Sequence, residues 1–272
     1  MEYVVAQGAA VPKIGLGTWQ LRGTACRRVV ETALDLGYRH MDTAQNYRNE
    51  RQVGAAINNS TVDREDVFLV TKLSPTNLSE QKVKESTYAS LARLNTEYVD
   101  CLLIHRPNPL VPLRETLDAM NDLVEEGVVH HIGVSNFSQA QLMAARDESL
   151  EPILTNQVRY TPFDRKQALV EYCQIHDVVL TAYSPFLHGG LLTDSTLSGI
   201  GLRYKKSAAQ VALRWLIQQD NVVAIPKASS YPHLKDNLEV FDFKLTDHEM
   251  ERIGRPSTAK TVSGTLRGFL AG

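Results

Sequence analysis

Short apolar runs alternate along this chain with stretches in which apolar residues recur at helical spacing. The run IGLGTW at 14–19 predicts a strand, the spacing over 24–36 predicts a helix, and Gly37 stands where a glycine commonly ends a helix. The same alternation continues to the region of residue 227. The further strands that it predicts are 39–42, 67–72, 100–105, 130–135, 155–160, 178–183 and 221–227, and the further helices are 49–58, 79–93, 113–126, 138–147, 165–176 and 206–219. We expect a hairpin within 1–13 and a long loop between 183 and 206.

This alternation predicts the fold. Strands that are separated by helices of about 10–15 residues imply βαβ units and a parallel sheet. Several of the runs are apolar without alternation, as is typical of strands that are covered on both faces. A length of 272 residues would fit two modest domains, but no Gly/Pro/Ser-rich linker divides the chain. Eight units in about 230 residues therefore favour a single-domain α/β fold, a closed (β/α)8 TIM barrel, over an open doubly wound sheet.

Composition and charge narrow the classes of partner. The net charge is −2, whereas a nucleic-acid groove or an anionic membrane surface requires clustered Lys and Arg. The three cysteines, Cys26, Cys101 and Cys173, are far apart and odd in number, which suggests neither a disulfide framework nor a metal knuckle. The N-terminus lacks the pattern of an export signal, and no apolar stretch approaches the ~18 residues of a membrane span. We expect a cytoplasmic monomer that binds neither nucleic acid nor membrane.

Polar residues close most of the apolar runs. In a barrel of this type the chemistry lies at the C-terminal ends of the strands, so these residues share one rim. The residues at the ends of the eight runs are Thr18, Trp19, Asp42, Lys72, His105, Ser135, Asn136, Gln157, Tyr183 and Lys227. A single His or Lys at a strand end is usually structural, but a full set on one rim favours a site.

The segment DTAQNY at 42–47 places a carboxylate and a phenol in one loop. A cation such as Lys72 beside Tyr47 would favour the phenolate and lower the pKa of the phenol, and Asp42 could pair with the lysine. His105 adds a second donor for the same substrate oxygen. This set suits protonation of a carbonyl oxygen. Because no side chain can deliver a hydride, a reduction here would require a cofactor.

Motifs along nearly the whole chain are similar to those of the aldo-keto reductase family. They are GLGTW at 15–19, GYRHMDTAQNYRNE at 37–50, TKL at 71–73, YVDCLLIHRP at 98–107, GVSNF at 133–137, NQ at 156–157, AYSP at 182–185, SAAQVALRW at 207–215 and IPKASS at 225–230. The chain resembles bacterial and archaeal members such as diketogluconate and aldehyde reductases. The resemblance implies one barrel over 1–272, with the hairpin at 1–13 and a segment at 228–272 that holds the adenosine end of the cofactor and a C-terminal helix and tail.

The resemblance also implies roles for individual residues. Tyr47 would be the general acid, Lys72 would adjust its pKa, Asp42 would anchor Lys72, and His105 would orient the substrate carbonyl. The nicotinamide would be held by Ser135, Asn136 and Gln157 and stacked on Tyr183, with Thr18 and Asp42 near its ribose, and Trp19 would also bind the cofactor. The pyrophosphate would meet Ser184, Phe186 and Leu187, and the adenosine end would meet Lys227, Ser229, Ser230, His233, Asp236 and Asn237. The motif GxGxxG is absent, as the resemblance leads one to expect.

The segment after IPK departs from the family in its charged residues. Many relatives carry an arginine for the 2′-phosphate of NADPH where this chain has His233, and a glutamate near the adenine where it has Asp236. A neutral imidazole lacks the bidentate phosphate contact of arginine. We therefore expect NADPH as cofactor with measurable use of NADH, and an NADPH affinity that improves as His233 protonates below about pH 6.5.

The expected substrate pocket is lined by Trp19, His105, Arg106 and Phe186. Arg106 stands where relatives commonly have a tryptophan, and it could pair with a carboxylate or a hydroxyl-rich substrate or point to solvent. The loop at 106–112 and the tail from about 257 are short for this family, which predicts an open pocket. The substrate classes left open are small dicarbonyls, keto-sugar acids and xenobiotic aldehydes.

The predicted activity is a reversible, NAD(P)H-dependent reduction of aldehydes and ketones to alcohols. The alternative from another class is a non-catalytic subunit that binds a nucleotide and senses redox state. A metal-dependent hydrolase is disfavoured because the chain has no HxH or HExxH motif, so we expect no metal site.

Overall fold

The computed structural model describes residues 1–186 and 191–254. Eight parallel strands form one sheet in the order of the sequence: β3 (Leu16–Gly17), β4 (His40–Asp42), β5 (Phe68–Leu73), β6 (Val99–Ile104), β7 (Val129–Ser135), β8 (Ile153–Arg159), β9 (Val179–Tyr183) and β10 (Val222–Ile225). A parallel bridge between Ile14 and Ala224, with the Gly15 amide donating to the Ala224 carbonyl at 2.9 Å, joins the first strand to the last. The sheet is thus a closed (β/α)8 barrel, as the alternation predicts.

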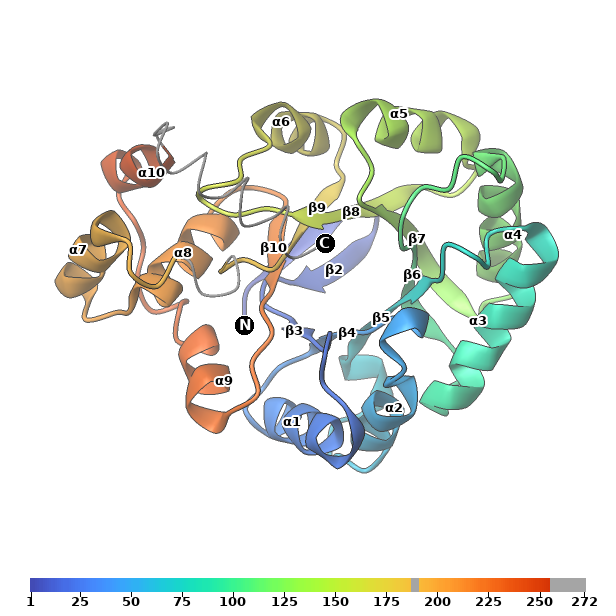
Figure 1. The fold of residues 1–272 in the computed structure, drawn as a ribbon, viewed down its shortest axis with the longest axis horizontal. Helices are drawn as coiled ribbons and strands as arrows, with labels where there is room; N and C mark the ends of the chain where they lie inside the picture. The colour runs from blue at the N-terminus through green and yellow to red at the C-terminus, as the bar shows by residue number, and fades with distance from the viewer. Residues whose placement is uncertain (187–190, 255–272) are drawn as a thin grey trace.

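Helices surround the barrel in Figure 1. Their bounds are α1 (Gly23–Asp35), α2 (Glu50–Asn58), α3 (Glu80–Leu94), α4 (Leu113–Glu125), α5 (Gln139–Glu148), α6 (Gln167–Ile175), α7 (Ser195–Tyr204), α8 (Ala208–Ile217), α9 (Tyr231–Leu238) and α10 (Asp247–Gly254), with short 3₁₀ turns η1 (Gln45–Tyr47) and η2 (Arg64–Asp66). Among the described residues, no helix combines the length and apolar character needed to cross a membrane.

Helix α7 lies in the stretch that the sequence pattern predicts as a loop, so that prediction is wrong. The Asp194 carboxylate accepts hydrogen bonds from the Thr196 and Leu197 amides and caps the helix start. Gly199 and Gly201 lie inside this helix, and because glycine is unfavourable in a helix interior, the sequence pattern does not indicate a helix here. Gly201 is required by packing, because a Cβ atom there would lie 2.2 Å from the Lys206 carbonyl oxygen.

The hairpin expected at 1–13 is present as β1 (Tyr3–Ala6) and β2 (Ala9–Pro12). Its buried side chains, Val4, Ala6, Ala9 and Val11, form one apolar cluster with Val70, Cys101, Leu103, Leu154, Val179 and Val223 of the barrel strands. Side chains two residues apart on a strand share a face, so Val70 lies on the same inner face as Lys72, and Leu103 on the same inner face as His105. The barrel interior is therefore apolar toward the hairpin and polar at the opposite end, where the predicted site lies.

Candidate active site

An ion pair between Asp42 and Lys72 lies at the centre of the polar end. The Lys72 Nζ atom donates to Asp42 Oδ1 at 2.6 Å and to the Thr43 carbonyl at 2.8 Å. Both residues are almost fully buried, with exposures of 0% and 1%. Neighbouring strands β4 and β5 bring them together, since Asp42 pairs in register with Val70, two residues before Lys72. Burial works against the charge of Lys72, but Asp42 and Tyr47 outweigh it and raise its pKa.

Tyr47 lies on η1, directly after β4. Its hydroxyl is 3.4 Å from the Lys72 Nζ atom, and the ammonium also lies 4.8 Å from the centre of its ring. The turn is fixed by Gln45, whose Nε2 group donates to the Ser86 carbonyl at 3.1 Å and whose Oε1 atom accepts from the Ser74 amide at 2.8 Å. The phenol is therefore held against the ammonium by bonds outside the ion pair.

The expectation that Lys72 lowers the pKa of Tyr47 describes only one of several influences. Burial raises the pKa of the phenol, Lys72 opposes this, and Asp42 adds to it, so the net direction is upward. A phenol with a raised pKa is protonated at neutral pH. The arrangement thus keeps a proton on Tyr47, as an acid requires.

His105 follows β6 and faces Tyr47. The two ring centres are 5.7 Å apart at an interplanar angle of 82°. Burial, together with the nearby charges of Lys72 and Arg106, lowers the pKa of His105 to about 3. Its Nδ1 atom is buried and has no hydrogen-bond partner among the described residues. His105 is therefore a neutral imidazole beside the phenol.

Gln157 reaches Asp42 from the far side of the barrel. It lies on β8, four strands along the sheet from β4, and its Nε2 group donates to Asp42 Oδ2 at 2.7 Å. Each oxygen of the Asp42 carboxylate thus has its own donor, Lys72 for one and Gln157 for the other. The sequence singles out Gln157 as a residue for the nicotinamide, and the structure adds this contact.

A second hydrogen-bonded group connects the ends of β7, β8 and β9. The Ser135 hydroxyl donates to the Gln157 carbonyl at 2.8 Å. The Asn136 Nδ2 group donates to the His105 carbonyl and to Ser135 Oγ, both at 3.0 Å, and its Oδ1 atom accepts from the Tyr183 hydroxyl at 2.8 Å. Asn136 has a left-handed backbone, with φ of 62°. These four predicted residues therefore lie together next to His105.

The remaining predicted residues fall into three groups. Thr18 is buried and its hydroxyl donates to the Asp42 carbonyl at 2.8 Å, whereas Trp19 beside it is 43% exposed. Ser184 and Phe186 are half-buried, and Leu187 lies outside the described residues. At the adenosine segment, Lys227, Ser229, His233 and Asp236 are exposed and Ser230 precedes α9.

Asn237 differs from its neighbours in this segment because it is buried. Its side chain interacts with the Tyr38 hydroxyl, which also donates to the Leu234 carbonyl at 3.0 Å. Asn237 therefore helps to seat α9 on the barrel. The sequence gives no sign of this contact.

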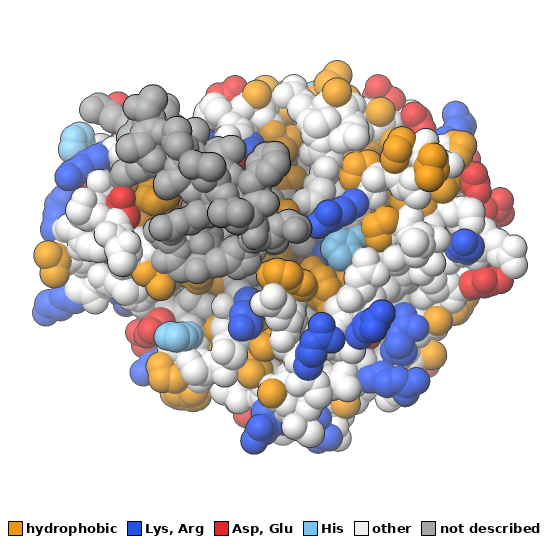
Figure 2. Space-filling model, in the orientation of Figure 1, with side chains coloured by type: hydrophobic (Ala, Val, Ile, Leu, Met, Phe, Trp, Pro, Cys, Tyr) orange, Lys and Arg blue, Asp and Glu red, His pale blue; other side chains and the backbone are white. Residues whose placement is uncertain are grey.

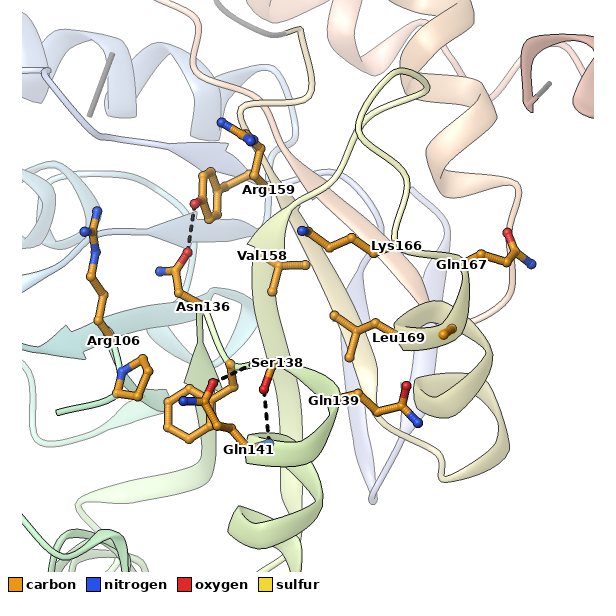
Figure 3. A pocket seen from close by; sticks show the side chains of 14 residues that line it. Arg106, Asn136, Ser138, Gln139, Gln141, Val158, Arg159, Lys166, Gln167 and Leu169 are labelled. Carbon is orange, nitrogen blue, oxygen red and sulfur yellow. Dashed lines mark hydrogen bonds between the residues drawn. The ribbon is translucent and has the colours of Figure 1, made fainter. Parts of the chain in front are cut away.

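A cleft of about 890 Å³ opens beside Asn136 and Tyr183 (Figure 3). Its lining includes Arg106, Asn136, Val158, Arg159, Lys166 and Tyr183. Figure 2 shows a His side chain next to a Lys or Arg side chain at the hollow in the middle of the visible face. Of the four residues expected to line the substrate pocket, Arg106 lines this cleft, whereas its lining does not include Trp19, His105 or Phe186.

Three residues that support the site are missed by reasoning from strand ends. Asn49 donates to the Thr18 carbonyl at 2.8 Å and accepts from the Thr43 hydroxyl at 2.7 Å, and Gln45 fixes η1. Asn49 and Gln45 fall within the motif at 37–50, which is the signal that could have drawn attention to them. The contact between Thr43 and Lys72 is made by the backbone carbonyl of Thr43, so it does not depend on the side chain and cannot be predicted from the sequence. Over residues 1–186 and 191–254, no cluster of His, Cys, Asp or Glu has the composition of a metal site.

Known proteins resemble the chain over most of its length. The model of the aldo/keto reductase family matches residues 13–255. An aldo-keto reductase of Mycolicibacterium smegmatis is 37% identical over 263 residues, which cover 96% of this chain and 95% of that protein. The methylglyoxal reductase DkgB of Escherichia coli is 35% identical over 90% of this chain and 92% of its own.

A solved structure supports the same assignment. The crystal structure of a candidate 2,5-diketo-D-gluconic acid reductase B superposes with a TM-score of 0.92 at 41% identity, over 94% of this chain and 92% of that one. The sequence matches and the structural match therefore cover most of the chain and indicate the same family. The chain belongs to the aldo/keto reductase family of NAD(P)-dependent oxidoreductases.

Proposed function

We propose that the chain reduces aldehydes and ketones to alcohols, reversibly, with Tyr47 as the general acid. The observation that carries this proposal is the buried series Asp42, Lys72 and Tyr47, joined by contacts of 2.6 and 3.4 Å, with the neutral His105 ring facing the phenol. In this series Tyr47 gives its proton to the carbonyl oxygen. The Lys72 ammonium then stabilises the phenolate that remains.

His105 orients the carbonyl in this proposal. A neutral imidazole carries one N–H group, and a buried N–H without an acceptor is rarer than a buried acceptor without a donor. Because Nδ1 is buried without a partner among the described residues, the proton is better placed on Nε2. That nitrogen then donates a hydrogen bond to the same oxygen that Tyr47 protonates.

The residues at the ends of β7 to β9 fit a nicotinamide cofactor, which supplies the hydride when it is bound. The carboxamide group needs both donors and acceptors, and Ser135, Asn136 and Gln157 offer both kinds in one hydrogen-bonded group. The bond between Asn136 and the Tyr183 hydroxyl fixes a ring on which the nicotinamide can stack. The bonds among the described residues use the Nε2 group of Gln157, which supports its Oε1 atom as the acceptor for the carboxamide.

The rest of the cofactor would extend along the rim. Thr18 and Trp19 would adjoin the ribose, and Asp42, whose oxygens are both engaged, would serve there as an anchor. Ser184, Phe186 and Leu187 would adjoin the pyrophosphate, and the adenosine end would meet Lys227, Ser229, Ser230, His233, Asp236 and Asn237. We propose NADPH as the preferred cofactor, with NADH also used because of His233.

The deciding experiment is the change Tyr47→Phe, assayed with a simple aromatic aldehyde. Removing the acid should lower kcat by about 10²–10⁴-fold. The affinity for NADPH, measured by fluorescence titration, should stay the same. Tyr88→Phe, at an exposed tyrosine on α3, is the matched control. Turnover of Tyr47→Phe within about tenfold of the wild type would show that another group donates the proton.

A further inference from the structure

Among the described residues, the cleft beside Asn136 and Tyr183 is lined by cations and by no Asp or Glu side chain. Its charged lining residues are Arg106, Arg159 and Lys166, and the others are Pro107, Asn136, Phe137, Ser138, Gln139, Gln141, Val158, Gln167, Ala168, Leu169 and Tyr183. The residues outside the described part of the chain, 187–190 and 255–272, contain no Asp or Glu.

Two of the three cations have no ion-pair partner among the described residues. Arg159 pairs with Asp164 at 2.6 Å, whereas neither Arg106 nor Lys166 takes part in a salt bridge over residues 1–186 and 191–254. Unpaired like charges around one cavity repel each other, and an anion that enters between them removes this cost. The cleft thus has an excess of positive charge on the side that a ligand would contact.

The start of α6 adds to this excess. Lys166 is the N-cap residue of the helix, no side chain caps the first turn, and the first turn holds no acidic residue. The N-terminus of a helix carries partial positive charge and free N–H groups, so a lysine at this position is unfavourable unless an anion is near. In Figure 3 the Lys166 side chain extends toward Val158.

The cleft adjoins the reacting groups through Arg106. This residue follows His105 in the chain and lines the cleft together with Asn136, whose side chain donates to the His105 carbonyl at 3.0 Å. A carbonyl held at Tyr47 and His105 therefore has its other substituents near Arg106. A cavity of about 890 Å³ has room for a substrate of several more carbon atoms.

We propose that this cleft binds the carboxylate of the substrate, so that the enzyme acts preferentially on aldehydes and ketones that carry a carboxylate group. Arg106 takes the carboxylate of short substrates, and Lys166 takes that of longer ones. The inference rests on the proposed reductase function. The carboxylate itself is unchanged: one hydride from the cofactor adds to the carbonyl carbon, one proton from Tyr47 adds to the oxygen, and the product is a hydroxy acid.

The test compares two para-substituted benzaldehydes, the anionic 4-carboxybenzaldehyde and the neutral 4-methylbenzaldehyde, with saturating NADPH. The wild type should show the higher kcat/KM with the carboxylate. In Arg106→Gln the ratio of kcat/KM between the two substrates should fall by about tenfold or more, mainly through KM, because a charge-assisted hydrogen bond is lost. Lys166→Gln should lower the ratio by a smaller factor. Lys82→Gln, at an exposed lysine of α3, is the control and should leave the ratio unchanged.

A binding measurement tests the carboxylate site independently of the reductase activity. Calorimetric titration of the enzyme–NADP⁺ complex with the product 4-(hydroxymethyl)benzoate should show binding that weakens in Arg106→Gln and with added salt. Equal kcat/KM for the two aldehydes, or an unchanged ratio in Arg106→Gln, would overturn the carboxylate site while leaving the reductase function intact. A rise in KM for NADPH that is the same with both aldehydes would assign the cleft to the cofactor and also overturn the inference. If neither aldehyde is reduced although NADPH binds, the proposed function itself fails.

Discussion

Gln157 and Asp42 meet across the interior of the barrel, where the Gln157 amide donates to Asp42 Oδ2 at 2.7 Å. The two residues lie on β8 and β4, so the bond connects opposite sides of the sheet. Together with the Lys72 contact to Oδ1, it fixes the plane of the carboxylate. The position of the Lys72 ammonium against Tyr47 therefore depends on β8, a strand that carries neither Asp42 nor Lys72 nor Tyr47.

Replacing Gln157 should disturb the acid as well as the cofactor. In Gln157→Leu, one buried oxygen of Asp42 loses its donor, and we expect kcat to fall by about tenfold or more. In Gln157→Glu, a second carboxylate beside Asp42 should shift the pH dependence of kcat, because two adjacent carboxylates do not both ionise readily. Gln81→Leu, at an exposed glutamine of α3, is the control. An effect limited to KM for NADPH, with an unaltered pH profile of kcat, would show that Gln157 serves the cofactor alone.

Breaking the buried ion pair should destabilise the fold. In Lys72→Met the Asp42 carboxylate is left buried without its counter-ion, and such a loss typically costs about 3–5 kcal/mol of unfolding free energy. Urea denaturation should show this as a lower midpoint with an unchanged slope. The double change Asp42→Asn with Lys72→Met should recover part of the loss, since neither charge then remains unpaired. A double variant as unstable as the sum of the single changes would contradict a direct coupling.

The pH dependence of the reaction should be flat through the neutral range. The pKa of His105 is lowered to about 3 and that of Tyr47 is raised, so neither group changes its protonation between about pH 5 and about pH 8. Reduction at saturating NADPH should decline only as the pH rises through the raised pKa of Tyr47. Initial rates over this range provide the test. An acidic decline with a midpoint near 6.5, the ordinary histidine value, would show that His105 titrates in the folded protein.

The same histidine links stability to pH. The unfolded chain gains a proton on this imidazole below about pH 6.5, whereas the folded protein does not until about 3. Its contribution to stability is therefore complete above about pH 6.5 and is lost progressively as the pH falls toward 3. Denaturation midpoints of the wild type and His105→Gln should converge or cross as the pH is lowered.

Cofactor preference should respond to His233. This residue is exposed on the first turn of α9, a few residues after Lys227 and Ser230 in the sequence. In His233→Arg, a bidentate contact to the 2′-phosphate should raise the ratio of kcat/KM for NADPH over NADH by about 10–100-fold. His248→Arg, at an exposed histidine of α10, adds the same charge away from this segment. A wild-type preference for NADPH above about a thousandfold, constant with pH, would contradict the proposed role of His233.

The architecture and the central groups of the site could be predicted from the sequence for a physical reason. The C-terminal ends of all strands in a parallel barrel lie at the same rim. A polar residue at the end of an apolar run, such as Lys72 or His105, is therefore expected at that rim. Helix α7 could not be predicted in this way, because Gly199 and Gly201 lower the helical propensity of its centre. The contact between Gln157 and Asp42 depends on the diameter of the closed barrel and on two side-chain rotamers. The Thr43 carbonyl and the buried Asn237 likewise follow from tertiary packing, which local patterns do not record.

The β1–β2 hairpin gives the barrel a floor. Because Val4, Ala6, Ala9 and Val11 pack into the apolar end of the strands, side chains fill that end of the barrel, and within the described part of the chain the candidate site faces the opposite, polar end. Under the proposed function, a nicotinamide bound over Asn136 and Gln157 would have to enter and leave by this polar end. The carbonyl compound would use the same end, so the hairpin, by closing the other end of the barrel, would make cofactor and substrate share one route.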